Sequence, residues 1–108
     1  MAKMRILLIC GSGASSGFMA ANMRKAAKKY GIDAEIEARS DTMLDDYIDK
    51  IDVLLVGPHL KFMETTLKEK CSKYNVPVAV IDNTTYGSLD GKRGLAIAQK
   101  TIKGTLNN

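Results

Sequence analysis

The chain has 108 residues, of which 45% are hydrophobic and 26% are charged, as is typical of one soluble domain. No apolar run is long enough to cross a membrane or to form the core of a signal peptide, so we expect a cytoplasmic protein whose single domain spans residues 1–108. A net charge of +4 without tryptophan or a dense basic stripe argues against nucleic-acid binding. With one histidine and two distant cysteines, we expect no disulfide, no metal and no other cofactor.

The first half of the chain predicts two strands and two helices. Residues 4–9 form a short apolar run ended by glycines, as in a buried strand. From Ser16 apolar residues recur at helical spacing. The apolar face of this helix consists of Met19, Met23, Ala26, Ala27 and Tyr30, and Gly31 is a typical stop. Residues 32–37 alternate as in an edge strand, and Ser40 or Asp41 then caps a short helix.

The second half repeats this alternation. Residues 52–56 predict a buried strand that ends in Gly57-Pro58. The stripe of a third helix follows, formed by Leu60, Met63, Leu67, Cys71 and Tyr74. Residues 76–81 predict the last strand, and a polar loop is expected over residues 82–91, which contain Tyr86 and the turn signal Asp90-Gly91. The final helix carries the apolar residues Leu95, Ala98, Ile102 and Leu106.

Strands that alternate with helices require a parallel sheet covered on both faces. Because crossovers are right-handed, few topologies remain. We predict an α/β fold with one sheet of four parallel strands in the order 2-1-3-4 and helices on both faces, which is flavodoxin-like. Ligands of such sheets bind at the carboxyl ends of the strands. The loops predicted at that edge are residues 10–17, 57–61 and 82–91.

Cys10 stands where the first predicted strand meets a loop of small residues, Gly11-Ser12-Gly13-Ala14-Ser15-Ser16-Gly17. Backbone amides at such a turn bind phosphate, and the helix dipole favours negative charge there. The same field stabilises a thiolate, so Cys10 is predicted to be a nucleophile in a phosphate-binding loop. In this loop Gly11 and Gly13 admit the phosphate, the serines donate hydroxyls, and Gly17 relieves crowding between helix and strand. The alternative is a buried cysteine before a plain serine-capped turn.

Two nucleotide-binding motifs do not fit this loop. Walker A requires a lysine that is absent here. A dinucleotide loop requires a third glycine where Ser16 stands, and Gly17 comes one residue late.

Other candidates lie near the same edge. His59 would contact a phosphate or a partner, or is simply a partly exposed loop residue. Asp82 is an acid or, more simply, an acceptor that fixes its loop, because a carboxylate would repel a nearby phosphothiol. Cys71 lies on an apolar stripe and is interpreted as packing. An exposed Phe18 or Met19 would offer an apolar docking contact.

A cysteine-headed phosphate loop in a small parallel α/β domain resembles two families. The low-molecular-weight protein tyrosine phosphatases carry Cys-x5-Arg, in which the arginine clamps the phosphate. Counted from Cys10, that position is Ser16, and no other arginine lies in the loop. The main charge stabilisation for hydrolysis is therefore missing.

The second family is the IIB component of the lactose/cellobiose type in the bacterial sugar phosphotransferase system, and this resemblance covers nearly the whole chain. The residues that carry it are Cys10 and its loop, Met23-Arg24, Lys29-Tyr30, the run from Asp52 to Pro58, Val80-Ile81-Asp82, Tyr86-Gly87 and Asp90-Gly91.

This resemblance implies a phosphocarrier in which Cys10 is phosphorylated and Gly11 to Gly17 bind the phosphate. A phosphohistidine on a IIA protein would be the donor, and the acceptor would be a β-linked disaccharide such as cellobiose, chitobiose or lactose, held by the membrane IIC component. A carrier must keep its phosphothiol from hydrolysis, which suits a loop without arginine. We expect a monomer that docks transiently, with His59 and Asp82 as candidate accessory residues. A phosphohydrolase and a non-catalytic anion-binding module stay as alternatives.

Overall fold

The computed structural model describes residues 3–10 and 16–106, which form a parallel sheet between two layers of helices. The elements in chain order are β1 (Met4–Cys10), α1 (Ser16–Lys29), β2 (Ala34–Ser40), the 3₁₀ turn η1 (Asp41–Met43), α2 (Leu44–Tyr47), β3 (Val53–Val56), the 3₁₀ segment η2 (Pro58–Met63), α3 (Glu64–Ser72), β4 (Val78–Val80), α4 (Asn83–Gly87) and α5 (Gly91–Leu106). All strand pairs are parallel and the order is β2-β1-β3-β4, which confirms the predicted topology. No helix in the described part of the chain is both long and apolar enough to cross a bilayer.

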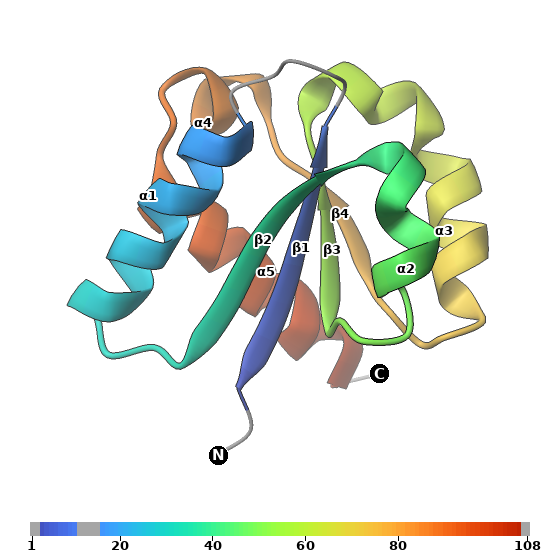
Figure 1. Ribbon diagram of the computed structural model, residues 1–108, viewed down its shortest axis with the longest axis horizontal. Coiled ribbons are helices and arrows are strands. Elements are labelled where there is room, and N and C mark those ends of the chain that lie inside the picture. Colours follow the sequence, from blue (N-terminus) through green and yellow to red (C-terminus); the bar gives the residue numbers. More distant parts are fainter. Residues whose placement is uncertain (1–2, 11–15, 107–108) are drawn as a thin grey trace.

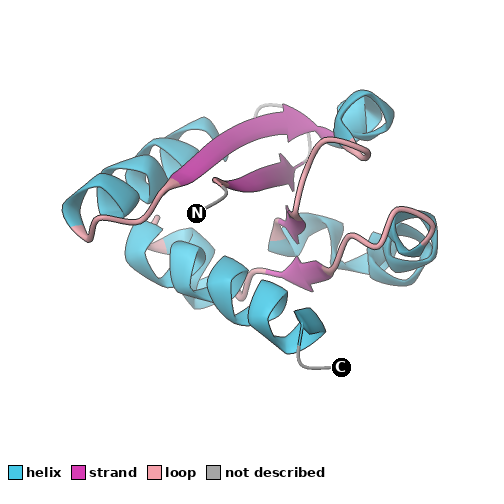
Figure 2. Cartoon of the chain, turned by 90° about the horizontal axis from the view of Figure 1, so that it is seen from below, coloured by secondary structure: helices cyan, strands magenta, loops and turns pink. Residues whose placement is uncertain are grey.

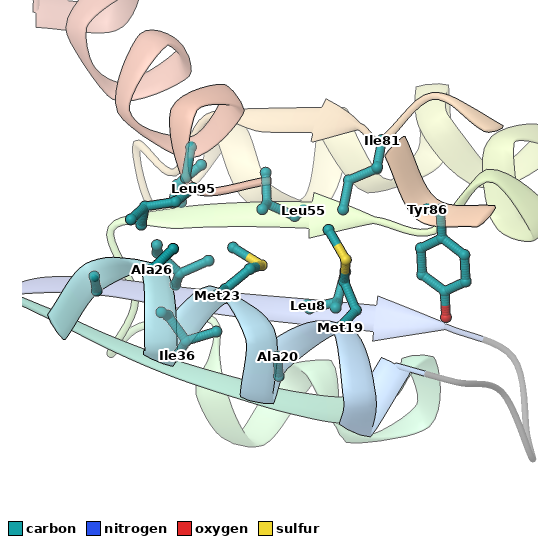
Figure 3. Packing of buried hydrophobic residues seen from close by; sticks show 14 of the residues in the cluster. Leu8, Met19, Ala20, Met23, Ala26, Ile36, Leu55, Ile81, Tyr86 and Leu95 are labelled. Atoms are coloured by element: carbon teal, nitrogen blue, oxygen red, sulfur yellow. The ribbon is translucent and has the colours of Figure 1, made fainter. Parts of the chain in front are cut away.

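The two faces of the sheet are covered by different helices. Helices α1 and α5 pack on one face, and α2 and α3 pack on the other (Figures 1 and 2). Side chains of β1 alternate between these faces: Ile6, Leu8 and Cys10 join the α1–α5 cluster, whereas Leu7 and Ile9 join the other. All five are at most 2% exposed, as expected for a central strand buried on both sides. The α1–α5 cluster extends from Ile36 and Leu95 to Tyr86 (Figure 3).

The structure confirms most of the buried apolar face that the sequence predicts for α1. Met19 and Met23 are fully buried, and Gly31 adopts a positive φ of 68° just beyond the helix end. Tyr30, predicted on the buried face, is instead 48% exposed, and Tyr74 after α3 is likewise 50% exposed. Both tyrosines follow the last residue of their helix, so the helical periodicity no longer decides which way they point.

Two segments predicted as loops at the carboxyl edge contain helical turns. Residues 58–63 form η2, which begins with proline in the first turn, where the missing amide costs nothing. The predicted polar loop of residues 82–91 contains α4, a helix of five residues. A segment this short has too few apolar positions to show a period. The edge strand β2 also begins two residues later than predicted and ends at Ser40.

Candidate functional site

Cys10 is the last residue of β1 and lies at the carboxyl edge of the sheet, where β1 stands between β2 and β3. Its side chain is 1% exposed and belongs to the α1–α5 cluster. The Cys10 Sγ lies 3.0 Å from the hydroxyl oxygen of Tyr86, a hydrogen bond between residues that are 76 positions apart. The fold therefore places the predicted nucleophile at the point where the winding of the sheet reverses, the usual ligand position in this architecture.

Most of the predicted phosphate loop, residues 11–15, lies outside the described residues. Ser16 is the first residue of α1, as predicted. A Cβ at Gly17 would meet no atom of residues 3–10 and 16–106 within 4 Å, so among the described residues Gly17 does not relieve the predicted crowding between helix and strand.

Tyr86 reaches Cys10 from α4, and Asp82 explains why α4 forms. The Asp82 carboxylate caps the helix by accepting hydrogen bonds from the Thr85 amide at 2.9 Å and from the Thr85 hydroxyl at 2.7 Å. These two hydrogen bonds hold the pKa of the Asp82 carboxyl below its ordinary value, and the bond from the Thr85 hydroxyl has the largest effect. The positive charge of Arg93 also lowers this pKa. Thr85 is fully buried and Tyr86 is 5% exposed. Asp82 thus fixes its segment, which is the simpler of its two predicted roles.

His59 comes to the same place from η2. Its ring meets the Tyr86 ring edge-on, with 5.1 Å between centroids and 84° between planes. Gly57 lies between His59 and Cys10, and a Cβ added to it would be 2.6 Å from Cys10 Sγ and 3.4 Å from His59 Nδ1. The end of β1 and the segments after β3 and β4 therefore bring Cys10, His59 and Tyr86 together, as the common edge of a parallel sheet requires.

Sequence reasoning places Tyr86 at this edge but does not assign it to the site. The sequence signal that could have identified Tyr86 is a helix-capping pattern. Asp82 is followed three residues later by Thr85, from which its carboxylate accepts hydrogen bonds. A capped turn in this segment fixes Tyr86, four residues after the cap, relative to the sheet. The sequence identifies Gly57 only as the end of a strand, and its close approach to sulfur is visible only in three dimensions.

The remaining candidates differ in burial and position. Cys71 is fully buried in the cluster on the opposite face, where burial raises the pKa of its thiol, in agreement with the packing role. Met19 is fully buried and offers no docking contact, whereas Phe18 is 70% exposed on the first turn of α1. Among residues 3–10 and 16–106 no cluster of three histidine, cysteine or acidic side chains is arranged to hold a metal ion.

Comparison with known sequences finds relatives that are all described as IIB components. The family model described as "PTS system, Lactose/Cellobiose specific IIB subunit" matches residues 5–96. The oligo-beta-mannoside-specific EIIB component of Bacillus subtilis is 36% identical over 89 residues, which cover 82% of this chain and 86% of that protein. The galactose-specific EIIB component of Lactococcus lactis subsp. cremoris is 36% identical over 107 residues, which cover 94% of this chain and 99% of that protein.

Solved structures agree with the sequence relatives. The cellobiose-specific IIB component of Borrelia burgdorferi superposes with a TM-score of 0.80 at 32% identity, over 96% of this chain and 95% of that chain. The lactose-specific IIB domain of Streptococcus pneumoniae superposes with a TM-score of 0.85 over 93% of this chain and 98% of that chain, and at 12% identity it supports the fold alone. The chain belongs to the lactose/cellobiose-specific IIB family and is a phosphotransferase component of a sugar phosphotransferase system.

Proposed function

We propose that Cys10 is the residue that carries the phosphoryl group. The observation that supports this most directly is its place at the end of β1, at the switch point of the sheet and just before the glycine- and serine-rich segment. The thiolate attacks phosphorus in a phosphohistidine of a IIA protein, so that an S–P bond forms and the N–P electron pair stays on the imidazole nitrogen. Backbone amides and serine hydroxyls of residues 11–17 bind the phosphoryl oxygens, with the α1 dipole behind them.

The second half of the cycle returns the sulfur to its starting state. A sugar hydroxyl held by the membrane IIC component attacks phosphorus, the S–P electron pair returns to sulfur as a thiolate, and the hydroxyl proton passes to water. A β-linked disaccharide such as cellobiose, chitobiose or lactose is the proposed sugar, which agrees with relatives named for cellobiose and oligo-beta-mannosides. A lactose-specific EIICB component of Streptococcus mutans is 26% identical over 91% of this chain, which spans 18% of that protein. A relative in which B and C units share one chain supports IIC as a partner.

Cys10 is 1% exposed, so both partners must cover the rim around it to reach its sulfur. Phe18 on the first turn of α1 is 70% exposed, and Phe62 in η2 is 81% exposed. Both elements begin at the carboxyl edge of the sheet (Figure 1). Exposed aromatic side chains on elements that begin at this edge are suited to transient docking. We propose a single-domain monomer that works in the cytoplasm, at the inner face of the membrane.

The test is the intact mass of the protein after incubation with phosphoenolpyruvate, the general phosphotransferase proteins and a cellobiose-type IIA. One phosphoryl group is expected on the wild type, none on Cys10→Ser, and one on the control Cys71→Ala, which removes the other thiol. Adding IIC membranes and cellobiose should remove the group and yield sugar phosphate. Release of phosphate from an aryl phosphate, without any stable adduct, would instead assign a hydrolase. An adduct that persists in Cys10→Ser would exclude Cys10 as the carrier.

A further inference from the structure

Helices α1 and α5 form one layer of the molecule, and this layer concentrates the positive charge of the chain (Figure 1). The two helices contain eight lysine and arginine residues and no acidic residue. The other eight basic residues lie with all twelve acidic residues in the rest of the chain, which therefore has a net charge of −4. The overall charge of +4 thus understates the charge of this layer, because its basic residues are far apart in the sequence and only the fold gathers them.

Four exposed lysines lie with Tyr30 where the last turns of α1 meet the start of α5. The Lys29 Nζ lies 5.7 Å from the centroid of the Tyr30 ring, and the Lys92 Nζ lies 5.2 Å from it. Lys25 precedes Lys29 by one turn of α1, and Lys28 is exposed on the same helix. We call Lys25, Lys28, Lys29, Lys92 and Tyr30 the lysine patch. In the described part of the chain none of its lysines pairs with a carboxylate, whereas the ion pairs formed there join residues of β2, α2 and α3.

The two arginines of the layer are engaged elsewhere. The Arg24 Nε donates a hydrogen bond of 2.8 Å to the carbonyl of Ile36, and the charge of Arg93 acts on Asp82. The patch therefore offers ammonium groups rather than the guanidinium forks that suit bidentate phosphate recognition in nucleic acids. Lysines that reach out from a helix, beside a half-exposed tyrosine, match the headgroup region of an anionic bilayer.

The position of the patch leaves Cys10 uncovered. Helix α1 starts at the carboxyl edge of the sheet and runs back to the start of β2, so residues 28–30 lie near the opposite edge. A surface bound there does not block the edge at which Cys10 meets its partners.

We propose that the lysine patch binds the anionic headgroups of the inner membrane leaflet. The inference rests on the proposed function, which places the phosphoryl acceptor in a membrane component. Held on this surface, the protein meets IIC at a higher effective concentration than it would from solution. The carboxyl edge stays open to IIA in the meantime.

The test measures cosedimentation of the protein with phosphatidylcholine vesicles that contain or lack phosphatidylglycerol. The wild type should bind only the anionic vesicles, and high salt should release it, because the screening length falls to about 3 Å at 1 M salt. A lysine near an anionic surface contributes about fivefold in affinity. A triple variant with Lys25→Gln, Lys29→Gln and Lys92→Gln should therefore bind about a hundredfold more weakly.

The matched control is a second triple variant with Lys68→Gln, Lys70→Gln and Lys73→Gln. These lysines are exposed at the end of α3, on the other face of the sheet, and their loss changes the net charge by the same amount. Two of them form surface ion pairs, which contribute little to stability. The control should bind anionic vesicles almost as tightly as the wild type. Equal losses in the two variants would mean that net charge alone drives binding, and would overturn the proposal.

A fluorescence measurement leaves the lysines unaltered. Because the chain has no tryptophan, Tyr30→Trp introduces a single fluorophore of this kind within the patch. Tyr74→Trp is its matched control, since Tyr30 is 48% exposed and Tyr74, after α3, is 50% exposed. On anionic vesicles the emission of the Tyr30→Trp variant should move to shorter wavelength, as expected for an indole in the headgroup region, and that of Tyr74→Trp should not. Equal shifts in both variants, or no shift in either, would contradict the proposed orientation.

Other occupants of the patch give different results. Tighter binding of a DNA or RNA oligonucleotide than of anionic vesicles at the same salt would assign the patch to nucleic acid. A higher KM for phosphorylated IIA in the first triple variant, with no vesicle binding by the wild type, would assign it to a protein partner. Either result overturns the proposal.

Vesicle binding is also independent of phosphoryl transfer. The assays use no phosphoryl donor, and Cys10→Ser should bind anionic vesicles as the wild type does. A protein that accepts a phosphoryl group but ignores the vesicles would refute the role of the patch alone. A protein that binds the vesicles but accepts no phosphoryl group would refute only the carrier function.

Discussion

The sulfur of Cys10 has its position only because residue 57 carries no side chain. A Cβ there would lie 2.6 Å from Cys10 Sγ, too close for both atoms to keep their places. Gly57 itself is in extended backbone, with φ −63° and ψ 150°, which alanine adopts without strain. Gly57→Ala should therefore fold without backbone strain and lose about 1 kcal/mol of stability, the usual value of a hydrogen bond, as the sulfur rotates away from Tyr86.

We expect Gly57→Ala to slow phosphorylation of Cys10 by about tenfold to a hundredfold, as for a reacting atom displaced by about 1 Å. Rapid-quench single-turnover assays with phosphorylated IIA measure this rate, and the urea midpoint reports stability. The control is Gly104→Ala, at an exposed position where a Cβ meets no atom within 4 Å. A rate within twofold of the wild type would show that the sulfur position does not limit transfer.

At the residue scale, the position of Cys10 at the end of a buried strand was predictable because its signal is local: an apolar run followed at once by glycines and serines. The contacts of Tyr86 and Gly57 with Cys10 were not predictable in the same way. Each reaches Cys10 from the end of another strand, and only the three-dimensional structure shows that contact. For the same reason the sequence identifies His59 as a residue of this edge but does not identify its partner, the Tyr86 ring.

At the scale of elements, α1 and α5 cross on one face of the sheet at a point where a side chain has no room (Figure 1). At Gly91, the first residue of α5, a Cβ would overlap the backbone carbonyl group of Asn22 and lie 2.6 Å from the amide nitrogen of Met23. Backbone atoms within a helix cannot rotate away as a side chain does. Gly91 therefore does more than form the predicted Asp90-Gly91 turn, because its missing side chain lets α5 pack directly on α1.

Gly91→Ala should lower the free energy of unfolding by about 1–3 kcal/mol, because α5 must move off α1. Gly104→Ala, in open space on the same helix, should raise it by about 0.5–1 kcal/mol through helix propensity. Urea unfolding followed by circular dichroism measures both. Equal and favourable effects of the two substitutions would show that the crossing adjusts to a methyl group at no cost.

The long elements were predictable because periodicity identifies a helix of four turns or a strand buried on both faces. The short ones were not: α4 has five residues and η2 is 3₁₀, so neither repeats long enough to show a pattern. What specifies α4 is a single cap, the Asp82 carboxylate on Thr85. The depressed pKa of Asp82 means that this contribution to stability is present above the ordinary carboxyl pKa and is lost as the pH falls through the lowered value.

At the scale of the whole molecule, the order β2-β1-β3-β4 puts β1 at the reversal of winding and brings the ends of β1, β3 and β4 to one edge. Topology was predictable since alternating strands and helices with right-handed crossovers leave few arrangements. The proposed chemistry therefore belongs to that edge. Tyr74, after α3, lies near the start of β4, at the opposite edge. This separation supplies a control for the docking surface.

Phe62→Ser should raise the KM for phosphorylated IIA by about tenfold with little change in kcat, because a contact formed equally in the ground and transition states affects binding alone. That factor corresponds to about 1.4 kcal/mol of binding free energy, a moderate loss for an aromatic side chain at an interface. Tyr74→Ser, which removes a half-exposed ring from the opposite edge, should leave both constants unchanged. Initial rates over a range of IIA concentrations measure the two constants. A fall in kcat at constant KM would instead mean that Phe62 acts on the reacting groups, and equal effects of both substitutions would show that IIA does not dock at the carboxyl edge.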